Sequence, residues 1–157
     1  MVGRKSLKGD YCPSARALDA IGDWWSLLIV RDAFDGLTRF SEFQKSLGIA
    51  KNILSDRLRT LTARGILELV PAAEGGARME YRLTPMGRDL FPVMVALRQW
   101  GERHLYEPDE EHSVLVDRET GQPVRLDVRA QDGREVGPDD TVILRVPEQT
   151  DEEPGQR

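Results

Sequence analysis

Four polar side chains with the chemistry to read DNA lie at Lys51, Asn52, Ser55 and Arg59, inside a segment with helical periodicity. At about 100° per residue they share one face of that helix. Asparagine can pair with adenine and arginine with guanine, and a lysine near the helix start can meet a phosphate. The neighbouring Asp56 would either accept from a cytosine amine or orient Arg59. Taken alone, such a stripe is more commonly a solvated face, so the surrounding elements must decide.

Basic residues outside this helix are further candidates for DNA contact. Arg78 and Arg82 fall on a strand-like run beside a glycine-rich turn, and we expect them to meet the DNA backbone rather than the bases. Arg39 and Lys45 could grip flanking phosphates, although surface solubility explains them nearly as well. Arg57 lies off the polar face and is either a contact or a structural ion-pair partner.

The elements that must position these residues can be read from periodicity and from glycine and proline punctuation. Leu54, Leu58 and Leu61 form an apolar stripe opposite the polar face, and Gly65 suits the left-handed position after the helix. Two strand-like runs, 66–71 and 78–84, then form a hairpin in which Met79, Tyr81 and Leu83 face the core. The predicted helices cover residues 12–22, 24–35, 41–47, 50–64 and 85–105, with a short strand at Thr38–Arg39 and a bend or late start at Pro92.

Charge divides the chain. The formal net charge is −5, yet residues 1–107 hold 16 Lys/Arg against 13 Asp/Glu, whereas residues 108–157 hold 6 against 14. A DNA-binding surface needs local positive potential, so an acidic chain does not exclude it. We therefore predict a basic domain over 1–107, a small β-rich extension over 108–147 and a disordered acidic tail over 148–157.

The extension carries short strand candidates separated by turn residues. Turns are predicted at Gly121-Gln122, Asp132-Gly133 and Pro138-Asp139-Asp140, which would give a small antiparallel sheet. The fold class is thus α+β, mostly α: a winged helix-turn-helix with a small C-terminal antiparallel β extension. The strand candidates are residues 113–116, 124–129, 134–136 and 141–146.

Several motifs together, in order over residues 11–105, resemble the HxlR-type winged helix-turn-helix regulators of bacteria. They are Cys12-Pro13 ahead of Leu18-Asp19-Ala20-Ile21-Gly22-Asp23-Trp24-Trp25, Arg39-Phe40-Ser41-Glu42-Phe43, Ile53-Leu54-Ser55-Asp56-Arg57-Leu58-Arg59 and Glu80-Tyr81-Arg82-Leu83-Thr84-Pro85-Met86-Gly87. The resemblance implies a homodimeric transcription factor on an operator of double-stranded DNA, paired through its first and last helices. Base preference does not transfer, because Ala50 and Asp56 depart from the family pattern.

The aromatic residues and the single cysteine leave alternatives open. Core packing is the favoured interpretation of Trp24, Trp25 and Trp100, although adjacent tryptophans cannot share one helix face, so one of the pair would lie at the dimer interface or against the last helix. Certain HxlR-type members sense oxidants with a cysteine near Cys12, but an inert, packed thiol is slightly favoured. The candidate dimer-interface residues are Trp24, Leu97, Trp100 and His104.

The remaining expectations concern what the chain lacks. It has no nucleophile elbow, phosphate-cradling loop or cluster of metal ligands, so we expect neither an enzyme nor a cofactor or metal. No apolar run is long enough to span a bilayer and no signal peptide is evident, which favours a cytoplasmic protein. The leading interpretation is a homodimeric DNA-binding regulator on a palindromic operator. Repression is the expected role, because it is the commoner one among small regulators that lack an activation segment. The alternative is a winged-helix module that acts through an unknown small-molecule effector, a redox signal or a protein partner.

Overall fold

The computed structural model describes residues 6–73, 75 and 77–144. Contacts between Cα atoms divide the chain into a first unit, Met1–Leu115, and a second unit, Val116–Arg157. The predicted boundary, between residues 107 and 108, lies earlier in the chain. The predicted disordered tail, 148–157, lies outside the described residues.

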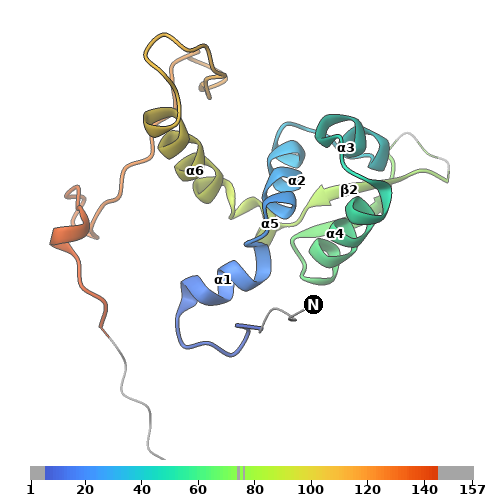
Figure 1. The fold of residues 1–157 in the computed structure, drawn as a ribbon, viewed down its shortest axis with the longest axis horizontal. Coiled ribbons are helices and arrows are strands. Elements are labelled where there is room, and N and C mark those ends of the chain that lie inside the picture. Colours follow the sequence, from blue (N-terminus) through green and yellow to red (C-terminus); the bar gives the residue numbers. More distant parts are fainter. Residues whose placement is uncertain (1–5, 74, 76, 145–157) are drawn as a thin grey trace, which may run out of the picture. The chain divides into compact units, whose positions relative to one another are not determined.

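The first unit is a winged helix-turn-helix, which confirms the predicted fold class. Its helices lie on a hairpin whose strands pair antiparallel, with Leu67 opposite Leu83 and Pro71 opposite Met79. The elements are α1 Pro13–Ile21, α2 Trp24–Phe34, α3 Phe40–Leu47, α4 Lys51–Ala63, β1 Leu67–Pro71, β2 Met79–Leu83, α5 Pro85–Arg88 and α6 Phe91–His104 (Figure 1).

Local chemistry explains where these helices begin and end. The Asp23 carboxylate caps α2 by accepting from the backbone N–H of Ser26 at 3.0 Å. Gly48, with φ of 60°, makes the left-handed corner between α3 and α4, and Gly65, with φ of 73°, makes the turn from α4 into the hairpin. These three predicted signals are confirmed.

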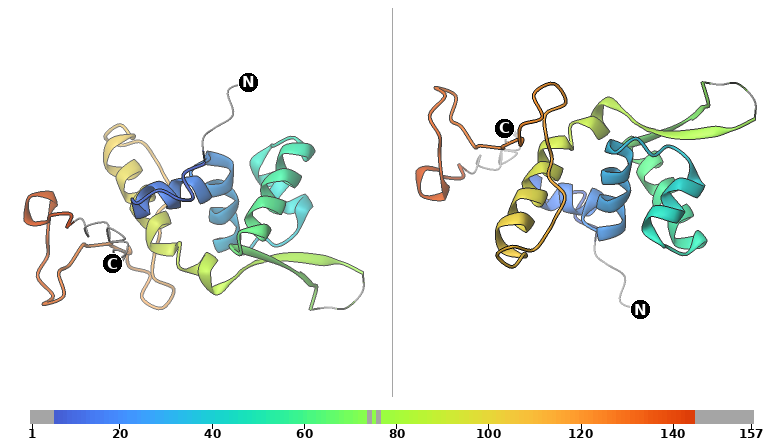
Figure 2. Two further views of the ribbon diagram at one scale, coloured as in Figure 1. Left: turned by 90° about the horizontal axis from the view of Figure 1, so that it is seen from below. Right: turned by 90° about the horizontal axis from the view of Figure 1, so that it is seen from above.

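The core of this unit lies where α2, α3, α4 and the hairpin meet. The apolar stripe of α4 is fully buried there, as predicted, and the hairpin runs along one side of these helices and extends beyond them as a ribbon (Figure 2). Burying a leucine contributes about 1.5–3 kcal/mol, so this stripe fixes which face of α4 meets solvent. The fully buried residues include Ile29, Val30, Phe43, Leu54, Leu58 and Leu61.

Two predicted elements differ in the structure. The last helix is divided at Asp89 and Leu90 into α5 and α6, because Pro92 suits the first turn of a new helix better than the interior of an old one. Gly87 anchors α5, since a Cβ there would come within 2.1 Å of the Ile66 carbonyl oxygen. The expected strand at Thr38–Arg39 is reduced to one ladder hydrogen bond, which the N–H of Tyr81 donates to the Thr38 carbonyl at 2.7 Å.

The described part of the second unit, residues 116–144, contains isolated antiparallel bridges in place of the expected strands. Val116 pairs with Pro123 around Gly121, and Arg129 pairs with Glu135 around Gly133, so the two glycine turns are placed as predicted. Pro138–Asp140 forms a 3-10 turn. The ladders stay short because little apolar surface is buried to hold them, and isolated two-stranded hairpins are marginally stable.

One carboxylate contributes to the stability of α3. Glu42 Oε2 accepts from the backbone N–H groups of Thr38 and Arg39, each at 2.9 Å. These hydrogen bonds lower the pKa of Glu42 below its ordinary value of 4.5, and the one from Thr38 has the largest effect. The lowered pKa means that the stabilisation is complete above that ordinary value and is lost as pH falls through the folded-state pKa.

We therefore expect Glu42→Gln to lower the free energy of unfolding by about 1 kcal/mol at pH 7, because a charged acceptor is replaced by a neutral one. At pH 3 the difference from wild type should shrink, since this pH lies below the ordinary pKa of 4.5 and protonation of the carboxyl group then favours the unfolded state. Urea unfolding followed by tryptophan fluorescence at both pH values measures this. A difference of equal size at both would refute the charge argument.

Candidate nucleic-acid interface

The polar face of α4 is open to solvent. Lys51, Asn52, Ser55 and Arg59 are all exposed, opposite the buried leucine stripe. Ala50 precedes the helix with extended backbone and has no side-chain acceptor to cap it. Backbone N–H groups at such a helix start can meet a phosphate, and the helix dipole favours the negative charge. The structure thus brings these four predicted side chains and an uncapped helix start onto one surface.

Asp56 contacts both arginines that follow it on α4, Arg57 and Arg59. Its Oδ1 lies 2.6 Å from Nη2 of Arg59, which matches the interpretation that Asp56 orients this arginine. Arg57 also contacts Asp56, with its Nη1 3.3 Å from Oδ2, and its Nε lies 3.1 Å from Oδ1 of Asp23, the residue that caps α2. Arg57 is therefore a structural ion-pair partner that ties α4 to the start of α2.

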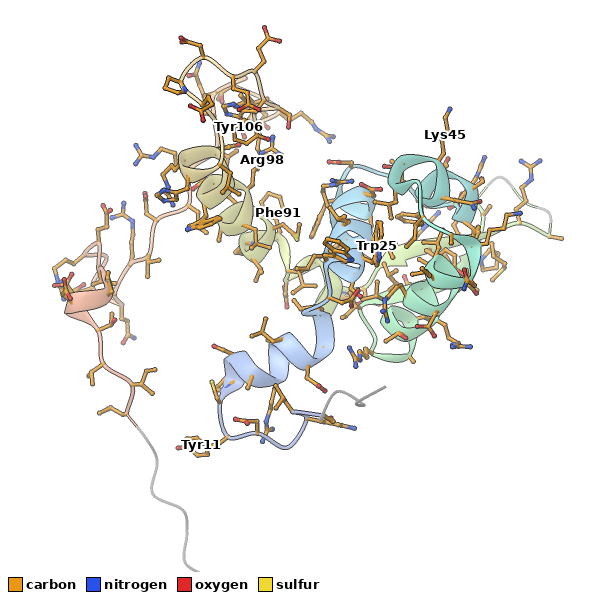
Figure 3. All side chains as sticks on the ribbon, viewed as in Figure 1. Tyr11, Trp25, Lys45, Phe91, Arg98 and Tyr106 are labelled. Atoms are coloured by element: carbon orange, nitrogen blue, oxygen red, sulfur yellow. The ribbon has the colours of Figure 1, made fainter. Side chains whose placement is uncertain are left out.

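The cations on α3 lie at its two ends. Arg39 precedes the helix and is half-buried, whereas Lys45 is exposed near its C-terminal end and points away from the helix (Figure 3). A lysine in the last turn also interacts favourably with the helix dipole. Both cations lie outside the polar face of α4.

Two exposed arginines lie on the hairpin: Arg78 just before β2, at its turn end, and Arg82 within β2. The predicted alternation of β2 is partly wrong: Met79 is 45% exposed, while Glu80 is 9% exposed. Glu80 is buried because both carboxylate oxygens face cations. Its Oε2 lies 2.9 Å from Nη2 of Arg82 and its Oε1 lies 3.9 Å from Nη2 of Arg39. Alternation alone could not reveal this, since Arg39 is distant in sequence.

The candidate dimer residues occupy a separate, apolar surface. Core packing, the favoured interpretation, is wrong for Trp24, which is 72% exposed, and for Trp100, which is 53% exposed, so their alternative assignment to the dimer interface stays a prediction; Trp25 packs against the core. Leu97, Trp100 and His104 are exposed on successive turns of α6. A single residue of α6 is classed as buried, so most of this helix lacks cover within the part of the chain that the structure describes.

Cys12 and Arg64 show two further differences between pattern and structure. The Cys12 thiol is exposed at the start of α1, so the interpretation of a packed thiol is wrong. Arg64 at the end of α4 donates to the carbonyl oxygens of Asp19 and Ala20, which joins α4 to α1. No local pattern in the sequence predicts this long-range contact.

An apolar cavity of about 520 Å³ lies between α2 and α6 and escaped the sequence analysis. Its walls include Trp24, Phe34, Phe91 and Met94, with Arg31 and Arg98 at its edge. Among the described residues, no group of three or more His, Cys, Asp or Glu is arranged to hold a metal, and no helix has the length and apolarity to cross a membrane.

This geometry, with a helix held by its buried leucines and a hairpin that carries two exposed arginines beside it, defines a winged helix-turn-helix protein of the transcription-regulator class. The HxlR-like helix-turn-helix family matches residues 20–109. The chain belongs to the HxlR-like helix-turn-helix family. Its relatives are regulators, not enzymes.

Known proteins and solved structures agree with this membership. An uncharacterised HTH-type transcriptional regulator of Mycobacterium tuberculosis, MT3179, is 47% identical over 94 residues, which span 60% of this chain and 60% of that relative. The crystal structure of the transcription factor PA1607 is 59% identical, has a TM-score of 0.86 and is matched over 90% of this chain and all of its own. The redox regulator HypR in its reduced form is 33% identical, with a TM-score of 0.55 over 60% of this chain and 94% of its own.

Proposed function

We propose that the protein is a DNA-binding transcriptional regulator that acts as a homodimer on a palindromic operator. We propose further that it is a repressor, which is the commoner role of small regulators. The observation that carries the proposal is the exposed polar face of α4 opposite three fully buried leucines. A helix held in this way can enter the major groove without disturbing the core. The hairpin then lies beside the groove, where Arg78 and Arg82 can meet phosphates.

The proposal assigns different roles to the candidate residues. Asn52, Ser55 and Arg59 face the bases, and Asp56 orients Arg59 toward guanine. The phosphate contacts come from Lys51 and from the wing and α3 cations, named as Arg39, Lys45, Arg78 and Arg82. Contacts of the second kind give affinity that falls steeply with salt, through counterion release.

Arg59→Ala should weaken operator binding by about 1–3 kcal/mol while the dimer persists, because the variant loses a base contact and no structural one. A fluorescence-anisotropy titration against a duplex selected from random sequences measures the loss, and sedimentation confirms the dimer. Arg118→Ala, which removes the same charge from an exposed site in the second unit, is the control. Unchanged affinity in Arg59→Ala would contradict the assignment of α4.

The dimer proposal depends on the apolar surface of α1, α2 and α6. Leu18, Trp24, Leu97, Trp100 and Leu105 are all exposed there. Patches of this kind on a single chain mark interaction sites, and a two-fold contact would cover the same patch on both copies. Two subunits related in this way would present their α4 helices to half-sites about one helical turn apart, or a multiple of it.

Trp100→Ala should weaken the dimer by about 2 kcal/mol or more, because buried tryptophans dominate interface energetics. Analytical ultracentrifugation across a concentration series measures the dissociation constant. The matched control is Leu69→Ala, which truncates an exposed apolar side chain on β1. Equal dissociation constants for wild type and Trp100→Ala would remove α6 from the interface.

A second candidate function, regulation by thiol oxidation, is favoured by the exposed Cys12 and by the similarity to a redox regulator. This cysteine is the chain's only one, so a disulfide would join two subunits or capture a small thiol. We expect diamide to produce a reducible dimer band or a mixed-disulfide mass with glutathione, and to alter operator affinity. Cys12→Ser is the control, and oxidation that leaves wild-type affinity unchanged would exclude this function.

A further inference from the structure

Glu80 is a charged side chain buried on β2, opposite Val70 in the strand register. It lies on the face of β2 that alternation assigns to solvent, yet only 9% of the residue is exposed. A carboxylate in such a position is costly unless cations and hydrogen bonds compensate it. Here two arginines do so, one from its own strand and one from the start of α3.

These contacts join two parts of the candidate interface. Arg82 reaches Glu80 along the same face of β2, while Arg39 reaches it from the turn before α3. The backbone makes the same connection, because the N–H of Tyr81 donates to the Thr38 carbonyl. β2 and the start of α3 are therefore joined by a backbone hydrogen bond and by an ion pair.

We propose that Glu80 is a positioning residue, a buried carboxylate that holds Arg39 and Arg82 together as a two-arginine clamp for the DNA backbone. The inference rests on the proposed function, in which both arginines meet phosphates. A guanidinium presents five N–H groups, so a contact with one carboxylate does not by itself occupy all of its donors. The carboxylate thus draws both side chains toward one point of the wing, with Arg82 hydrogen-bonded to it and Arg39 at ion-pair distance.

The same carboxylate also restrains the clamp. Its negative charge offsets one of the two positive charges, which lowers attraction to any duplex whatever its sequence. A unit charge about 7 Å from a phosphate changes affinity about threefold when water screens the pair. Glu80 should therefore raise the specificity for the operator in two ways. It orients the arginines for one register of phosphates, and it lowers their affinity for DNA of any other sequence.

The test compares two duplexes of equal length, one selected from random sequences by the wild-type protein and one scrambled. For Glu80→Gln we expect affinity for the scrambled duplex to rise about threefold and affinity for the selected duplex not to rise. The specificity ratio then falls at least about threefold, and the salt dependence of binding steepens by up to about one unit in log–log slope.

Glu68→Gln is the matched control. Glu68 lies opposite Arg82 in the strand register and is exposed, so the substitution removes the same charge from the same face of the hairpin. No ion pair joins it to Arg39 among the described residues. We expect this control to raise affinity for both duplexes alike and to leave the ratio unchanged. If Glu80→Gln behaves like the control or like wild type, the positioning role is refuted.

Glu80→Asp tests the geometry should Glu80→Gln fail to fold, as judged by circular dichroism. It keeps the charge but shortens the side chain, so the ratio should fall while the salt slope stays at the wild-type value. An unchanged ratio would overturn the inference. A wild-type chain that binds neither duplex would overturn the proposed function itself, whereas wild-type binding with unaltered Glu80 variants would overturn only this inference.

Discussion

The burial of one apolar stripe on α4 is the constraint on which the other features depend. Leu54, Leu58 and Leu61 are fully enclosed, so α4 cannot rotate about its axis without exposing them. Exposure of all three would cost several kcal/mol, a large fraction of the stability of a typical domain. The polar face is therefore determined by the core, and the ion pair from Arg57 to Asp23 adds a second attachment to α2.

Electrostatics act locally on this framework. The acidic net charge comes from residues 108–157, while the surface formed by α3, α4 and the hairpin carries several exposed cations. Two acids on that surface lie in contact with its arginines: Asp56 contacts Arg59, and Glu80 contacts Arg82. Each carboxylate reduces the local charge and also fixes a direction, so this surface combines moderate positive potential with defined geometry.

The sequence predicted the features that local rules control. The Asp23 cap, the corners at Gly48 and Gly65 and the leucine stripe follow from capping, backbone sterics and periodicity, each within a few residues. The ion pair of Glu80 with Arg39 joins residues about forty positions apart, and no local rule reports it. The break before α6 was anticipated only in part, because Pro92 allows a bend as readily as a new start.

The misassigned tryptophans show why a one-chain interpretation of hydrophobicity is incomplete. Core packing is the favoured interpretation of Trp24 and Trp100 from the sequence, with the dimer interface as the alternative, and both are exposed in the single chain. The apolar residues of α6 are nevertheless periodic. Leu97 and Trp100, three positions apart, share one exposed side of the helix, whereas Val95 is buried. An apolar stripe indicates that a helix face is buried in the functional protein. It does not distinguish burial within the same chain from burial against a second copy.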